Sequence, residues 1–65
     1  MDFSNIIKNI RTSLKLSQEE LARELGVSFA TINRWENEKS TPSRLALVAV
    51  KDFCNKKGLI YEDLK

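Results

Sequence analysis

The chain has 65 residues, 42% of them hydrophobic, and a formal net charge of +2 from 11 basic and 9 acidic residues. Its single cysteine excludes an internal disulfide, and the lack of histidine removes the common zinc-ligand patterns and the usual general base. No segment resembles a signal peptide or reaches the roughly 20 apolar residues of a membrane-spanning helix. We therefore expect one soluble, cytoplasmic domain over residues 1–65, with no membrane association, metal, cofactor or small-molecule ligand.

The first predicted helix lies near the N-terminus, where Asp2 or Ser4 can act as its cap. Apolar residues recur there at helical spacing: Phe3, Ile6, Ile7, Ile10 and Leu14. Polar and charged residues, among them Arg11, occupy the positions between them. This pattern predicts an amphipathic helix whose apolar face belongs to the core.

Two short helices joined by a tight turn are predicted next. Ser17 is a favourable N-cap, and Glu20, three residues later, completes a capping box. Gly26 can adopt the left-handed conformation that ends a helix without steric cost, and Ser28 can then cap the second helix. A helix, a short turn containing glycine and a second helix form a helix-turn-helix motif, which we place at residues 17–37.

The second helix of this motif has two chemically different faces. Ile32 and Trp35, three residues apart, are predicted to point into the core. At 100° per residue, the other side carries Ala30, Asn33, Arg34 and Asn37, flanked by Phe29 and Thr31. A guanidinium suits guanine and an amide suits adenine through bidentate hydrogen bonds, and apolar groups can contact the thymine methyl. This outer face is therefore predicted to read the edges of DNA bases.

At this point the sequence resembles a known family, the phage-repressor and Cro-like helix-turn-helix proteins. The residues that carry the likeness are Ser17-Gln18-x-x-Leu21-Ala22, Gly26-Val27-Ser28 and Ile32-x-x-Trp35-Glu36-Asn37. The likeness is close from Leu16 to Pro42 and fades beyond Leu47. It implies an all-α fold, a compact bundle of four to five short helices similar to the DNA-binding domain of lambda repressor.

The resemblance also implies roles for individual residues. It implies that Gln18 contacts a DNA phosphate, at a helix N-terminus where the helix dipole also favours an anion. It implies an ion pair between Arg11 and Glu36; the alternative is that Arg11 is a free surface cation or contacts phosphate directly. The family commonly has glycine where this chain has Glu38, so Asn37, which tolerates the left-handed conformation, is expected to end the helix.

A longer helix is predicted between Pro42 and Gly58. Pro42 fits the first turn of a helix, with Thr41 or Ser40 as its cap, and Gly58 fits the position just after the last turn. A further short helix is expected from Tyr61 to Leu64.

The beginning of this longer helix is apolar on all sides, which indicates burial on two sides. The residues expected in the core are Leu47, Val50 and Cys54. The residues expected to contact a second copy of the chain are Leu45, Val48, Ala49 and Phe53. A domain this small has little core to cover two faces of one helix, so the second face is predicted to form a dimer interface.

Sequence-specific binding of double-stranded DNA is the leading hypothesis, in a transcriptional regulator with repression favoured. The predicted base-reading residues are Phe29, Ala30, Asn33 and Arg34. The predicted contacts to the DNA backbone are Gln18, Ser28, Thr31, Asn37, Lys39, Arg44 and Arg11. A homodimer on a palindromic operator is expected, because proteins of this kind bind two half-sites about one helical turn apart.

The alternative hypothesis is a protein-interaction module of the same fold, in an antitoxin-like or anti-repressor role. In that case Phe29 and Ala30 would dock a partner protein, and the low net charge is compatible with this role. Catalysis is not expected, because the sequence has no nucleophile–base pair, metal-ligand set or glycine-rich phosphate loop.

Overall fold

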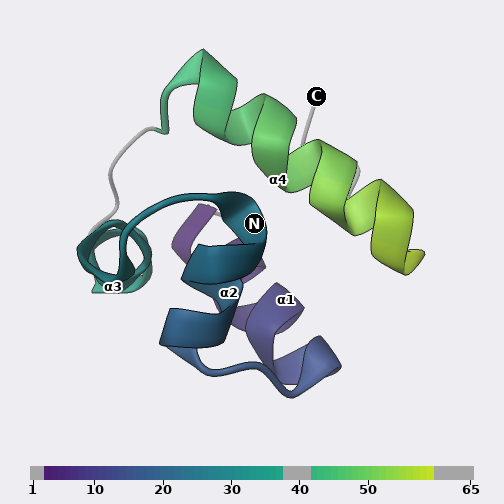
Figure 1. Cartoon of the computed structure of the whole chain (residues 1–65), viewed down its shortest axis with the longest axis horizontal. Helices are drawn as coiled ribbons and strands as arrows, with labels where there is room; N and C mark the ends of the chain where they lie inside the picture. The colour runs from purple at the N-terminus through teal and green to yellow at the C-terminus, as the bar shows by residue number, and fades with distance from the viewer. Residues whose placement is uncertain (1–2, 38–41, 60–65) are drawn as a thin grey trace.

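The computed structural model describes residues 3–37 and 42–59 (Figure 1). Four α-helices occupy this part of the chain: α1 (Phe3–Leu14), α2 (Gln18–Leu25), α3 (Phe29–Asn37) and α4 (Arg44–Lys57). These ranges contain no strand, so the predicted all-α bundle is confirmed. Lys39, the expected caps Ser40 and Thr41, and the helix expected from Tyr61 to Leu64 lie outside the described residues.

A core of buried apolar side chains joins the four helices. Its members are Ile6, Ile7, Ile10, Leu21, Ala22, Ile32, Trp35, Val50, Phe53 and Cys54. Phe3 packs edge-on against Trp35, with ring centroids 5.2 Å apart and ring planes at 80°, a favourable geometry for two aromatic rings. The apolar spacing of α1 and the inward orientation of Trp35, both predicted from the sequence, are therefore confirmed.

The caps around the motif turn have the predicted geometry. The backbone N–H of Glu20 donates to Ser17 Oγ at 3.0 Å, and the backbone N–H of Ser17 donates to Glu20 Oε1 at 2.8 Å, which completes the capping box. Gly26 ends α2 with a φ of 72°. The backbone N–H of Thr31 donates to Ser28 Oγ at 3.1 Å, so Ser28 caps α3. The motif helices α2 and α3 thus begin at the predicted caps, and α2 ends at the predicted glycine.

The end of α3 differs from the prediction. Asn37 is the last helical residue of α3 and does not have a positive φ; among the described residues that are not glycine, Lys15 has one, at 56°. The side chain of Asn37 donates a hydrogen bond to Asn33, one turn earlier on the helix. This bond favours helical geometry at Asn37, and the predicted left-handed conformation of Asn37 was wrong.

The start of α4 also differs. The helix begins at Arg44, and the backbone N–H of Ala46 donates to Ser43 Oγ at 3.1 Å. Ser43 is therefore the N-cap, and Pro42 precedes the helix instead of lying in its first turn. The prediction that Ser40 or Thr41 caps this helix was wrong, because Ser43, in extended backbone, has the N-cap position and its hydroxyl accepts from the first turn.

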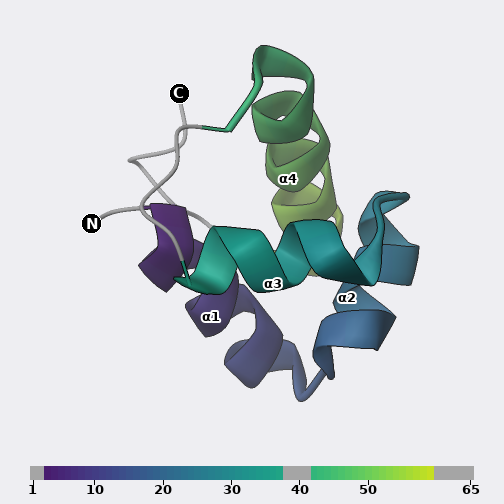
Figure 2. The same cartoon turned by 90° about the vertical axis from the view of Figure 1, so that its left-hand side faces the viewer.

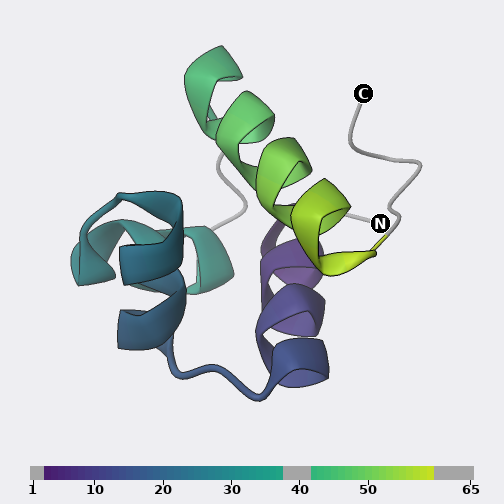
Figure 3. The same cartoon turned by 45° about the vertical axis from the view of Figure 1, so that its right-hand side comes forward.

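α4 is buried more deeply in its second half than in its first, where Ala46 and Leu47, the latter predicted for the core, are partly buried against the core. Figures 2 and 3 show its first turns standing away from the remaining three helices. Leu45 and Val48 in this first part are 83% and 49% exposed, whereas Val50 and Cys54 are buried as predicted. The structure thus leaves an apolar helix surface at Leu45 and Val48 without cover from the described part of its own chain.

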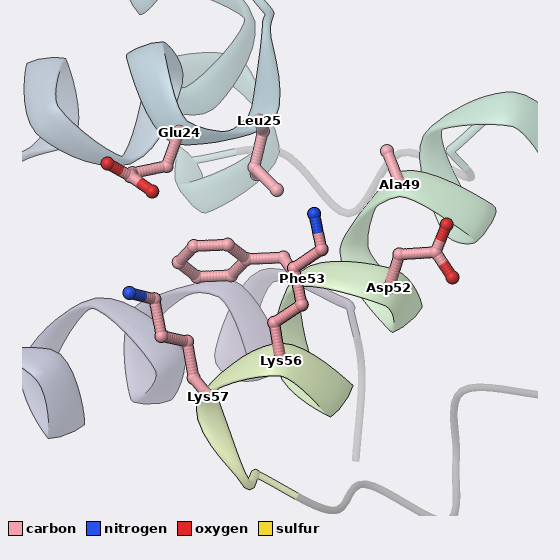
Figure 4. Close-up of a pocket in the computed structure, with 7 residues that line it drawn as sticks. All are labelled: Glu24, Leu25, Ala49, Asp52, Phe53, Lys56 and Lys57. Atoms are coloured by element: carbon pink, nitrogen blue, oxygen red, sulfur yellow. The ribbon is translucent and has the colours of Figure 1, made fainter.

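Phe53 does not belong to that exposed surface, contrary to the sequence prediction. It is 6% exposed, and its ring lies between α2 and α4 near Leu25, with Lys57 Nζ 5.8 Å from the ring centroid (Figure 4). A helix that is apolar on all sides does not reveal where its neighbour crosses, so its spacing alone could not assign Phe53 to the core. Gly58 ends α4 with a φ of 74°, as predicted.

Candidate nucleic-acid interface

α3 is held on the core by two side chains and presents its other side to solvent. Ile32 is fully buried and Trp35 is 8% exposed. Figure 2 shows α3 lying across the front of the molecule, with α1 and α2 behind it. The exposed residues of α3 include Phe29, Ala30, Asn33, Arg34 and Asn37. The structure therefore brings all four predicted base-reading residues onto the outer side of one helix.

Arg34 and Phe29 give this outer side its chemical character. Arg34 is exposed and has no ion-pair or hydrogen-bond partner in residues 3–37 and 42–59. Its guanidinium can therefore offer all of its donors to a ligand. Phe29, at the first position of α3, is 49% exposed, so half of an aromatic ring is open to an apolar group beside the helix start.

The two asparagines on this side are joined to each other. Asn37 Nδ2 donates to Asn33 Oδ1 at 2.9 Å. The sequence prediction gave Asn33 and Asn37 separate roles and did not include this bond. The feature of the sequence that could have predicted the bond is the spacing of four residues, because side chains four residues apart are neighbours on a helix surface.

A pair of hydroxyls lies at the start of α3. Ser28 Oγ and Thr31 Oγ1 are 2.9 Å apart and share a hydrogen bond. Ser28 Oγ also accepts the N–H of Thr31 as the helix cap. One hydroxyl donates to the other, so the remaining O–H is available to donate to an anion near the helix N-terminus.

A buried carboxylate ties the exposed helix to the rest of the motif. Glu36 is 5% exposed. Arg11 Nε donates to Glu36 Oε2 at 2.7 Å, and Arg11 Nη2 donates to Oε1 at 2.9 Å. Gln18 Nε2 donates to the same Oε1 at 3.2 Å. The three side chains thus connect α1, the start of α2 and the end of α3.

The charges in this network are stabilised by their neighbours. Burial alone raises the pKa of Glu36, but the hydrogen bonds from Arg11 and Gln18, with the charges of Arg11 and Lys8, outweigh burial and lower it. Hydrogen bonding to Glu36 raises the pKa of Arg11. Both partners are therefore ionised at neutral pH, and the bidentate pair is of the stronger kind.

The ion pair that the family resemblance implied is confirmed, and the alternative of a free Arg11 was wrong. The guanidinium is engaged by Glu36, and its Nη1 also donates to the carbonyl oxygen of Leu16 at 3.4 Å. Arg11 therefore connects α1 to α3 through Glu36. It is not placed as a cation on the outer side of α3.

Gln18 is the first residue of α2, and its side-chain amide is anchored by Glu36. The amide has two N–H groups, so one remains for an anion. The carboxylates of Glu19 and Glu20 lie in the same turn, and the pKa of Glu20 is lowered by its hydrogen bonds with Ser17. The phosphate contact of Gln18 remains a prediction, now with a fixed side-chain position.

Arg44 is not brought together with the other predicted backbone contacts. It is exposed at the beginning of α4. Figures 1 and 2 show that the beginning of α4 lies apart from α3. Arg44 is therefore not placed to contact the same part of a ligand as the outer side of α3.

The described residues offer no second site that competes with the outer side of α3. No group of three or more His, Cys, Asp or Glu in them is arranged to hold a metal ion, and none of their helices has the length and apolar character needed to cross a bilayer. A hollow of about 230 Å³ lies between α2 and α4, lined by Glu24, Asp52, Lys56 and Lys57 around Phe53 (Figure 4). The charges of its two acidic and two basic residues offset each other. The hollow is separate from the outer side of α3.

Comparisons with known proteins agree with this geometry. The family model described as Helix-turn-helix matches residues 7–61. The HTH-type transcriptional activator BcrR of Enterococcus faecalis is 36% identical over 53 residues, which cover 82% of this chain and 26% of the activator. The type II methyltransferase M1.ScrFI of Lactococcus lactis subsp. cremoris is 40% identical over 55 residues, which cover 80% of this chain and 14% of the methyltransferase. No solved structure matches the chain.

The two relatives have different activities, and each is similar to this chain over a minor part of its own length. The residues matched by the family model contain the capped turn between α2 and α3 and the buried network of Arg11, Gln18 and Glu36. The family match extends over most of the sequence and includes all four helices in whole or in part. The chain therefore belongs to the helix-turn-helix family.

Proposed function

We propose that this domain binds double-stranded DNA sequence-specifically, with α3 in the major groove, and thereby regulates transcription. The observation that carries the proposal is the division of α3 into two sides. Ile32 and Trp35 fasten it to the core, whereas Asn33 and Arg34 are open to a ligand. A guanidinium and an amide side by side match the hydrogen-bonding groups of guanine and adenine in the major groove.

The size of α3 is compatible with this placement. An α-helix with its side chains is about 10–12 Å in diameter, and a major groove about 12 Å wide accepts it. The N-terminal part of a recognition helix reaches the bases. Phe29 and Ala30 would then contact thymine methyl groups, and Asn33 and Arg34, one turn further on, would form hydrogen bonds to base edges.

Several polar groups around α3 would fix the register on the DNA backbone. The hydroxyls of Ser28 and Thr31 and the amide of Gln18 lie at helix N-termini, where a phosphate is favoured. Lys39 and Arg44 are proposed as further phosphate contacts from their charge and place in the sequence. Arg11 is assigned to the ion pair with Glu36 instead.

A homodimer on a palindromic operator is proposed from the uncovered part of α4. Leu45 and Val48 expose apolar surface on turns that stand away from the other helices, with Ala49 partly buried beside them. A two-fold pairing of these turns would remove this surface from water. It would also set two copies of α3 at a fixed distance, as paired half-sites require.

Repression is the proposed direction of regulation, because a bound domain that covers a promoter blocks transcription without further contacts. The relative from Enterococcus faecalis is named an activator, so the opposite direction is a defined alternative. A reporter gene placed behind the selected operator distinguishes the two: reporter output that falls when the protein is expressed supports repression, and output that rises contradicts it.

Selection of bound sequences from random DNA duplexes tests the proposed function. We expect a motif with two inverted half-sites about one helical turn apart. A selected pool without base preference, at low salt as well as at physiological salt, would contradict the proposal. It would favour the protein-interaction alternative, in which the half-exposed ring of Phe29 contacts a partner protein.

A further inference from the structure

The hydrogen bond between the two asparagines on the outer side of α3 has a consequence for base choice. Asn37 Nδ2 donates to Asn33 Oδ1 at 2.9 Å, and both residues are exposed. The bond fixes which way the Asn33 amide is turned, with its oxygen toward the C-terminal end of α3. The amide nitrogen of Asn33 has no partner in the described part of the chain.

Adenine and guanine place different demands on such an amide. Adenine presents a donor at N6 and an acceptor at N7 in the major groove, whereas guanine presents acceptors at both O6 and N7. An amide oxygen has two lone pairs, so Asn33 Oδ1 can accept from adenine N6 while it still accepts from Asn37. Asn33 Nδ2 is then free to donate to adenine N7.

We propose that Asn37 is a positioning residue that orients the Asn33 amide for adenine and thereby sets specificity at one base pair. This inference rests on the proposed DNA-binding function. It differs from a phosphate contact of Asn37, which would strengthen binding to every sequence alike. Asn37 is the last residue of α3, and base contacts come from the beginning of a recognition helix. Asn37 therefore acts through Asn33.

The test is the selection of duplexes by the wild-type chain and by Asn37→Ala, followed by affinity measurements on the selected site and on its adenine-to-guanine variant. Releasing the Asn33 side chain adds a rotamer-ordering cost on binding, so Asn37→Ala should reduce the adenine preference roughly 2- to 10-fold. Preferences at the other base pairs should be retained. Asn37→Gln keeps an amide donor and should retain most of the adenine preference.

Two controls separate the possible results. Asn33→Ala should remove the preference at the same base pair, and Asn55→Ala, at an exposed asparagine on α4, should change nothing. If Asn37→Ala weakens all sequences equally, lowers the salt dependence and leaves the adenine preference intact, Asn37 contacts phosphate and the inference is overturned. If the wild-type chain itself selects no base, the proposed function fails, and the inference with it.

Discussion

Arg11 and Glu36, 25 positions apart in the sequence, are joined by two hydrogen bonds at a point where three helices meet. The carboxylate also accepts a hydrogen bond from Gln18. Because Glu36 is on α3 and Gln18 begins α2, the bond between them helps to fix the position of α3 relative to α2. The geometry of the proposed DNA contact therefore depends on the ion pair of Arg11 and Glu36, neither of which is proposed to contact DNA.

Removing the charge of Glu36 should destabilise the fold. In Glu36→Gln, Arg11 loses a charged partner while its side chain is still 26% exposed, so water compensates for part of the loss. We expect a decrease of about 1.5–3 kcal/mol in the free energy of unfolding, the range for hydrogen bonds to charged groups, measured by urea denaturation. Glu24→Gln, at an exposed position of α2, should stay within about 0.5 kcal/mol; an equal loss in both variants would argue against a special role for Glu36.

The same pair predicts how stability depends on pH. The folded state lowers the pKa of Glu36, so the unfolded chain binds its proton first as the pH falls. The stabilisation is complete above the unfolded pKa of about 4.3 and is lost as the pH drops toward the folded pKa. Unfolding free energies between pH 6 and pH 3 should fall steeply for the wild type. Glu36→Gln should show a shallower decline, with Glu20, whose pKa is also lowered, contributing the remainder.

Gly26 ends α2 with a φ of 72°, and a Cβ added there would meet nothing within 4 Å. The cost of Gly26→Ala is therefore purely conformational, about 1–2 kcal/mol for a left-handed residue with a side chain. Gly26→Asn should cost less, because asparagine tolerates this conformation. Thermal unfolding of both variants measures the difference. An unchanged melting temperature for Gly26→Ala would mean that the turn does not require a left-handed conformation at residue 26.

These stabilising features differ in how far they could be predicted from the sequence. The capping box at Ser17, the left-handed turn at Gly26 and the inward position of Trp35 follow from local rules, because each depends on residues within one or two turns. The assignment of Phe53 depends on where α2 crosses α4, which spacing along one helix does not contain. The spacing of Asn33 and Asn37 makes a bond between them possible, but whether it forms depends on their side-chain conformations, which the sequence does not specify.

The uncovered part of α4 predicts a change of oligomeric state. Leu45, 83% exposed and second in α4, can be replaced by glutamate without loss of helix stability, because a negative charge suits a helix N-terminus. Leu45→Glu should shift the chain toward the monomer in sedimentation equilibrium while its melting curve as a monomer is preserved. Asn55→Glu adds the same charge at the other end of α4 and should leave the association unchanged; equal behaviour of the two variants would place the dimer contact elsewhere.

Arg34 and Lys39 should affect DNA binding in different ways if α3 lies in the groove. Arg34 is exposed beside Asn33 on the outer side of α3, so Arg34→Ala should cost about 1–3 kcal/mol at its own base pair and relax specificity there. Lys39→Ala, at a residue proposed to contact phosphate, should weaken all sequences alike and lower the salt slope by about 1. Titrations of each variant against single-base operator changes, at several salt concentrations, separate the two effects. If Arg34→Ala keeps every base preference, the wild-type Arg34 guanidinium contacts the DNA backbone. The remaining outer residues of α3 would then be the ones that contact the bases.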